Sequence, residues 1–141
     1  MKPTAPPLGQ IMETGLYVAD MDVARHFYES VMGLTPMFAD ARLTAYPVAQ
    51  ASVLLLFQQG STEAPAPAFD GVIPPHDGQG RLHYAFAIAE GDLPAWRTHL
   101  GSHDVEIEGE VHWPKGSTSV YFRDPDGHLV ELATPGLWRN Y

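Results

Sequence analysis

The stretch that decides the fold reads Ser119-Val-Tyr-Phe-Arg-Asp-Pro-Asp-Gly-His-Leu-Val-Glu131. Two β-like runs, residues 117–123 and 128–133, flank Asp124-Pro-Asp-Gly127, in which Pro fixes φ and Gly accepts a positive φ. The stretch therefore predicts a hairpin in which Tyr121 and Glu131 lie nearly opposite each other, on one face. Glu131 has apolar neighbours on both sides, where an ionised carboxylate needs a partner, and a metal ion is a common one.

An internal repeat extends this interpretation to the whole chain. Residues 13–20 read Glu-Thr-Gly-Leu-Tyr-Val-Ala-Asp, and residues 83–90 read His-Tyr-Ala-Phe-Ala-Ile-Ala-Glu. Both stretches are rich in β-forming residues, both end in Ala plus an acid, and both run into a helical pattern. The sequence thus predicts two similar modules.

Each module is predicted to continue with one helix. In the first module, Asp20 is the expected N-cap of a helix that runs to about Val31, and Gly33 ends it. In the second module, Asp92 is the expected cap of a shorter helix, with Pro94 in its first turn.

Short β-like runs follow each helix, at residues 42–48 and 52–58 and then at 105–111, 117–123 and 128–133. The stretch 61–80 is rich in Pro, Gly and Ala and is interpreted as a linker. The prediction is an α+β fold made of two β-α-β-β-β modules. The expected boundaries are about 10–60 for module one, 61–80 for the linker, 81–135 for module two and 136–141 for a tail.

Side chains alternate across a strand, so parity assigns faces. The bulky residues of the two repeated strands are expected to pack under the helices: Leu16, Val18, Tyr84, Phe86 and Ile88. The opposite face begins with an ionisable residue, Glu13 or His83, and continues with Gly or Ala, which leaves room for another group. Glu13, His83 and Glu131 are therefore the candidate metal ligands.

Each candidate also has an ordinary structural explanation. Glu13 fits a solvated acid at a strand edge, and His83 fits a core histidine bonded to a backbone carbonyl. Glu131 fits an ion pair with Arg123. The repeat places Glu13 and His83 at equivalent points, which favours one shared site.

Composition excludes several classes of function. The chain has no Cys, which removes disulfides and thiolate chemistry. Its net charge is -9 with only 8 Lys and Arg, which argues against a nucleic-acid partner. The longest apolar run, residues 53–57, is too short for a bilayer, and the N-terminal residues lack a signal-peptide pattern. A small-molecule partner and a cytoplasmic location are the expectations.

The repeat and the C-terminal stretch, roughly residues 10 to 135, resemble the vicinal-oxygen-chelate superfamily, which includes glyoxalase I, fosfomycin-resistance proteins, bleomycin-resistance proteins and extradiol dioxygenases. The resemblance implies modules that pair into a curved mixed sheet around a divalent metal, with Glu13, His83 and Glu131 at the ligand positions. The ending also resembles the extradiol ring-cleavage signature, which implies that Tyr121 and His112 orient a phenolic or enolic substrate. Homodimers are common among similar proteins, with modules paired within one chain or exchanged between chains.

The sequence departs from the family pattern at two metal-ligand positions. Glu13 stands where His or Gln is usual, and Leu56 stands where glyoxalase I has a Glu. The implied ligand set is one imidazole and two carboxylates, which favours Mn(II), Mg(II) or Fe(II) and leaves Zn(II) or Ni(II) open. Alternatively, Glu13 is a base beside the metal. The departures argue against glyoxalase I itself, which uses four ligands.

Three functional hypotheses follow. The first is a divalent-metal enzyme (a lyase, isomerase or dioxygenase) whose small substrate chelates the metal through adjacent oxygens. The second is a non-catalytic drug-binding or metabolite-binding protein of the bleomycin-resistance type. The third is a paralogue that kept the fold and lost the site.

Overall fold

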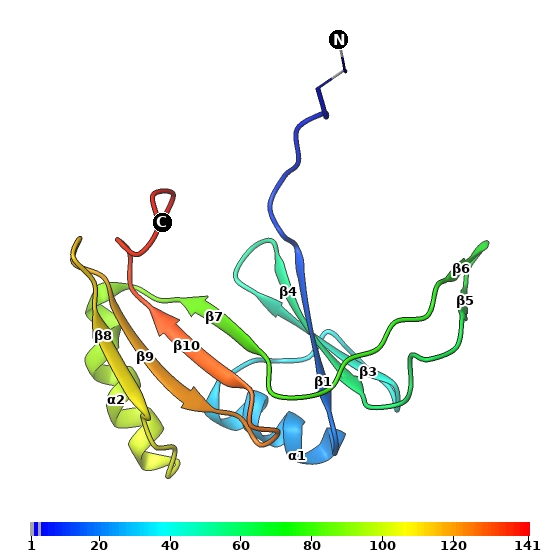
Figure 1. Ribbon diagram of the computed structural model, residues 1–141. Helices are drawn as coiled ribbons and strands as arrows, with labels where there is room; N and C mark the ends of the chain where they lie inside the picture. The colour runs from blue at the N-terminus through cyan, green and yellow to red at the C-terminus, as the bar shows by residue number, and fades with distance from the viewer. Residues whose placement is uncertain (1, 3) are drawn as a thin grey trace.

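The computed structural model describes residues 2 and 4–141 and contains two four-stranded sheets with the same internal order (Figure 1). The first sheet has the order β1-β4-β3-β2 and the second the order β7-β10-β9-β8. In each sheet the outer pair, β1 with β4 or β7 with β10, is parallel, and the other pairs are antiparallel. The repeat seen in the sequence is therefore a repeat of topology.

The first module consists of β1 (Glu13–Val18), helix α1 (Met21–His26), the π-helical turn η1 (Phe27–Val31), β2 (Phe38–Ala39), β3 (Leu43–Val48) and β4 (Ser52–Gln58). The predicted cap is confirmed, because the Asp20 carboxylate accepts hydrogen bonds from the backbone N–H groups of Asp22 and Val23. The predicted helix is divided into an α-helical part and a π-helical part. Gly33, at φ 73°, follows its end.

The second module consists of β7 (His83–Ala87), a 3₁₀ turn η2 (Glu90–Asp92), α2 (Leu93–Ser102), β8 (Gly109–His112), β9 (Thr118–Arg123) and β10 (Leu129–Ala133). Asp92 lies at the N-cap position of α2, as predicted, but it also closes the 3₁₀ turn and its carboxylate makes no capping hydrogen bond. The predicted strand at residues 105–111 began too early, because β8 starts only at Gly109 and ends at His112.

The core lies between the sheets and the helices. Leu16 and Val18 are buried under α1, as parity predicted, while Tyr84, Phe86 and Ile88 pack against the same cluster. The modules are joined by buried polar contacts. The Tyr84 hydroxyl donates to the Tyr28 hydroxyl at 2.9 Å, and Tyr28 donates to the Asp124 carboxylate at 2.7 Å.

The linker contains a small hairpin that the sequence did not predict, made of β5 (Ala66–Ala68) and β6 (Gly71–Ile73). In Figure 1 this green hairpin extends away from both sheets. The residues that flank the hairpin return to the first sheet, where Thr62 and His76 contact the Tyr17 hydroxyl. Among residues 2 and 4–141, no helix is both long and apolar enough to cross a bilayer.

Candidate metal centre

The face of the second sheet that points away from the helices carries the candidate residues of module two. We call it the open face of the second sheet. The β9–β10 register places Tyr121 opposite Glu131, as the sequence predicted. The β7–β10 register places Ala85 opposite Glu131, and His83 lies two residues earlier on β7. The small side chain of Ala85 leaves room for the imidazole and the carboxylate to approach.

His83 and Glu131 form the centre of this face. The imidazole Nε2 lies 3.3 Å from Glu131 Oε1. The other ring nitrogen, Nδ1, lies 3.0 Å from the carbonyl oxygen of Leu129, which can only accept a hydrogen bond. Nδ1 therefore carries the proton in the neutral ring, and Nε2 presents a lone pair to a carboxylate oxygen. Two acceptors at this distance repel each other unless a proton or a metal ion lies between them.

Two residues orient the carboxylate of Glu131, which is only 5% exposed. The Ser119 hydroxyl donates to Glu131 Oε2 at 2.5 Å, and the Trp113 indole N–H donates to the Ser119 hydroxyl at 2.8 Å. Oε2 is thus occupied by a donor while Oε1 faces His83. Neither Ser119 nor Trp113 was predicted from the sequence, although strand parity puts Ser119 on the same face as Tyr121.

Tyr121 stands beside this pair, with its ring centroid 6.3 Å from that of His83. The pKa of Tyr121 is raised, first by burial and further by the negative charge of Glu131, while a hydrogen bond with Ser119 opposes the shift. The phenol therefore stays protonated at neutral pH and is chemically able to donate a hydrogen bond at the edge of this pair.

Glu13 lies elsewhere in the same chain. It starts β1, pairs with Val53 of β4, and is exposed on the face of the first sheet that points away from α1, which we call the open face of the first sheet. Within the part of the chain that the structure describes, no group of three His, Cys, Asp or Glu residues could hold a metal ion. One chain therefore brings His83 and Glu131 together and leaves Glu13 apart.

His112 does not join the site. Gly109 of β8 pairs with Tyr121, so alternation turns Glu110 and His112 to the opposite face. Glu110 there forms an ion pair with Arg97 of α2, and His112 lies on the exposed side of that pair. The expectation that His112 acts beside Tyr121 is corrected by this register.

The strand register also corrects the expectation that Leu56 is the residue of module one equivalent to Glu131. Glu131 pairs with Ala85, and the equivalent Gly15 pairs with Leu55. The matching residue is therefore Leu55 on the open face, whereas Leu56 is buried on the helix side. The first sheet has an apolar residue where the second has its carboxylate.

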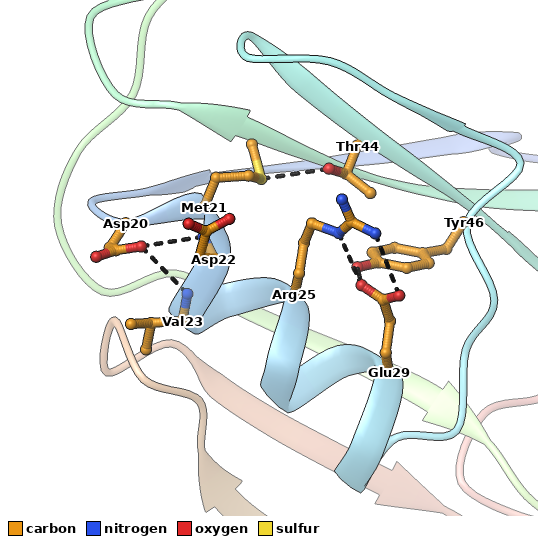
Figure 2. A network of polar contacts seen from close by, with 8 residues as sticks. All are labelled: Asp20, Met21, Asp22, Val23, Arg25, Glu29, Thr44 and Tyr46. Atoms are coloured by element: carbon orange, nitrogen blue, oxygen red, sulfur yellow. Dashed lines mark hydrogen bonds and ion pairs between the residues drawn. The ribbon is translucent and has the colours of Figure 1, made fainter.

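A second polar network belongs to the helix side of module one (Figure 2). The Arg25 guanidinium donates to both carboxylate oxygens of Glu29, and the buried Tyr46 hydroxyl donates to the same carboxylate at 3.1 Å. The hydrogen bond from Arg25 is the main reason that the pKa of Glu29 is lowered. This network ties α1 and η1 to β3 and does not reach the open face.

Comparison with known proteins agrees with this architecture. Residues 8–132 match the model of the Glyoxalase/Bleomycin resistance protein/Dioxygenase superfamily. The chain is 30% identical over 122 residues to metallothiol transferase FosB of Staphylococcus epidermidis, covering 85% of this chain and 78% of that protein. It is 32% identical over 130 residues to metallothiol transferase FosB of Shouchella clausii, and the match covers 85% of this chain and 76% of that protein.

The crystal structure of lactoylglutathione lyase from Agrobacterium tumefaciens superposes with a TM-score of 0.84 at 34% identity, covering 95% of this chain and 99% of that one. This likeness confirms the predicted α+β fold. The names of these relatives are those of enzymes, which supports the glyoxalase-like or dioxygenase-like interpretation of the sequence. The chain belongs to the Glyoxalase/Bleomycin resistance protein/Dioxygenase superfamily.

Proposed function

We propose that this protein is a divalent-metal-dependent enzyme whose small substrate chelates the metal through adjacent oxygens. The observation that carries the proposal is the approach of His83 Nε2 and Glu131 Oε1 to 3.3 Å while His83 Nδ1 is held by a backbone carbonyl. This arrangement fits a metal ion, because the lone pair and the charge converge on one point and each ligand has its own supporting hydrogen bond. A divalent ion held there supplies Lewis acidity to a substrate oxygen.

We infer that Glu13 of a second copy of the chain completes the centre. Glu13 and His83 occupy equivalent places in the two modules, yet in one chain they lie on different open faces. A homodimer that pairs the first sheet of one copy with the second sheet of the other brings them together. Large apolar side chains that one chain leaves exposed are available for such contacts, notably Leu8 at 97% and Ile11 at 84% exposure.

The remaining residues of the open face have roles that follow from their chemistry. Ser119 fixes the Glu131 carboxylate, and the protonated Tyr121 donates a hydrogen bond to a substrate oxygen. Glu13 acts as a third ligand or as the base that takes a proton from the substrate. Two carboxylates and one imidazole favour Mn(II), Mg(II) or Fe(II), with Zn(II) or Ni(II) as the softer alternatives.

The first test is the metal content of protein purified without chelator or affinity tag. We expect about one divalent ion per chain in the wild type and loss of the ion in His83→Ala. A wild type that carries no ion, and gains no thermal stability from Mn(II), Fe(II), Ni(II) or Zn(II), would contradict the proposal.

The contribution of the second copy is tested by mixing two variants that each lack one half of the centre. With Glu13 as the third ligand, Glu13→Ala and Glu131→Ala should each fail to hold metal alone. In a mixed dimer, one site combines the intact Glu13 of one copy with the intact His83 and Glu131 of the other. Remixing after mild denaturation should therefore restore metal to about one site per mixed dimer. No recovery in mixed dimers, verified by mass, would show that the copies do not share a centre.

A second candidate function is supported by Leu55. An apolar residue at the point equivalent to Glu131, next to Gly15, suits a non-catalytic drug-binding or metabolite-binding protein of the bleomycin-resistance type. Stoichiometric binding of an apolar ligand that a chelator does not change, without turnover, would favour this candidate over the metalloenzyme.

A further inference from the structure

Arg42 has an unusual environment at the end of the first sheet. Among residues 2 and 4–141, its Nε is the one buried side-chain nitrogen or oxygen without a hydrogen-bond partner. Its guanidinium also forms no ion pair with any Asp or Glu in that part of the chain, whereas Arg25, Arg97 and Arg123 each have an acidic partner. A desolvated donor without an acceptor is costly, so its persistence calls for an explanation.

The backbone of Arg42 is held firmly while its guanidinium stays free. Its N–H donates to the Asp40 carboxylate at 2.8 Å, and its carbonyl accepts from the Gln58 N–H at 2.9 Å. The guanidinium carbon lies 5.7 Å from the centroid of the Phe57 ring. Stacking on an aromatic ring orients a guanidinium without using its N–H donors.

Phe57, the aromatic neighbour of Arg42, lies on the same face of the first sheet as Glu13. The Phe57 ring lies over Gly15, where an added Cβ would come within 3.2 Å of the ring. Gly15 follows Glu13 by two residues on β1, a separation of roughly 7 Å along a strand. The guanidinium thus lies against a ring that shares a face with Glu13, and the register pairs Phe57 with Tyr17, four residues along β1 from the proposed ligand.

His76 and Tyr17 complete an aromatic wall around Phe57. The His76 ring meets Phe57 edge-on with centroids 4.8 Å apart, and Tyr17 stacks on Phe57 at 5.6 Å. His76 is fixed by a chain of hydrogen bonds. The Thr62 hydroxyl donates to the His76 carbonyl, so the Tyr17 hydroxyl donates to Thr62 and accepts from His76 Nδ1–H. In neutral His76, Nε2 is left as a further acceptor at this corner.

We propose that Arg42 binds a carboxylate of the substrate, and that the substrate is an aromatic or apolar carboxylic acid whose adjacent oxygens lie at the metal centre. This inference rests on the proposed function for the position of the adjacent oxygens. The orphan Nε–H and a neighbouring Nη–H form the parallel pair of donors that a carboxylate accepts. The wall of Phe57, His76 and Tyr17 suits an apolar body between the two polar ends.

The carboxylate site is tested first without metal. The Arg42 Nε–H signal is followed in ¹H–¹⁵N spectra of the metal-free full chain, and it is assigned by its absence in Arg42→Met. We expect 3-phenylpropionate to shift this signal and to bind at least about ten-fold more tightly than its amide, because charge-assisted hydrogen bonds are roughly twice as strong as neutral ones. An unmoved Arg42 signal at saturation, or equal affinities for acid and amide, would overturn the proposal.

The second test uses metal-loaded protein with 3-(3,4-dihydroxyphenyl)propionate and its amide. The preference for the acid should be present in the wild type and in Arg97→Met, which removes an equal charge on the helix side. It should be lost in Arg42→Met and reduced in Arg42→Lys, with metal content unchanged in both. A preference that survives in Arg42→Met overturns the Arg42 site. A wild type that takes up no metal overturns the proposed function instead, and the metal-free titration still decides the role of Arg42.

Discussion

The imidazole of His83 and the carboxylate of Glu131 converge on one point, 3.3 Å apart, from neighbouring parallel strands of the second sheet. Each side chain is oriented by a further hydrogen bond: His83 Nδ1 bonds to the Leu129 carbonyl, and Glu131 accepts from the Ser119 hydroxyl. A single chain therefore preforms two of three proposed ligands. Pre-formed ligands lose little conformational freedom when an ion binds, which favours affinity.

Removal of the Ser119 hydroxyl should weaken the centre without touching a proposed ligand. Ser119→Ala takes a donor from Glu131 and leaves the Trp113 indole N–H without its acceptor. We expect metal affinity to fall about 10-fold to 100-fold and stability to fall by about 1–3 kcal/mol. Chelator competition and urea unfolding measure the two effects. Ser102→Ala, on the exposed end of α2, is the control, and equal affinities in the two variants would contradict the supporting role of Ser119.

Gly78 should tolerate no side chain, because an added Cβ would lie 2.5 Å from the Tyr17 ring. The ring cannot turn away easily, since its hydroxyl is bonded to Thr62 and His76. We expect Gly78→Ala to lower the free energy of unfolding by about 1–3 kcal/mol. Gly91→Ala meets no atom within 4 Å and should change it by less than about 0.5 kcal/mol. Thermal and urea unfolding of both variants check this, and equal stabilities would show that the linker moves freely.

Asp124 should make the protein more stable as the pH falls toward 4. Burial is the main cause of its raised pKa, against which the Tyr28 hydrogen bond acts. The folded state therefore holds the proton more tightly than the unfolded state. The contribution of Asp124 to the free energy of unfolding therefore grows as the pH falls from its raised folded pKa toward its unfolded pKa of about 3.9. The stability difference between wild type and Asp124→Asn, measured by urea unfolding from pH 7 to 4, should rise in favour of the wild type. A difference that falls over this range would show that the ionised form is preferred.

Glu29 should show the opposite pH dependence. The hydrogen bond from Arg25 is the largest cause of its lowered pKa, and the bond from Tyr46 acts in the same direction. The stabilisation is therefore fully present above the unfolded pKa, near about 4.3, and is lost as the pH falls through the folded pKa. Glu29→Gln should cost about 0.5–1 kcal/mol at pH 7, given the partial exposure of the pair, and the cost should shrink as the pH falls through the folded pKa. A cost that is independent of pH would mean that the charge contributes nothing.

Local patterns in the sequence predicted much of the fold. Alternation placed Leu16 and Val18 in the core, and turn chemistry around Asp124–Gly127 gave the hairpin in which Tyr121 pairs with Glu131. The N-cap at Asp20 also followed from local chemistry. These features depend on residues close in sequence, so spacing alone predicts them.

The tertiary structure decided the features that depend on register between distant strands. Whether His112 shares a face with Tyr121 depends on where β8 begins, because a shift of one residue reverses every side chain. The approach of His83 to Glu131 depends on the parallel pairing of β7 with β10, which no turn fixes. The contact of His76, a linker residue, with Phe57 likewise depends on packing between segments far apart in the sequence. The sequence by itself determined the repeated module and its candidate ligands. Only long-range packing decided which of them meet within one chain, since that packing sets distances that local spacing leaves free.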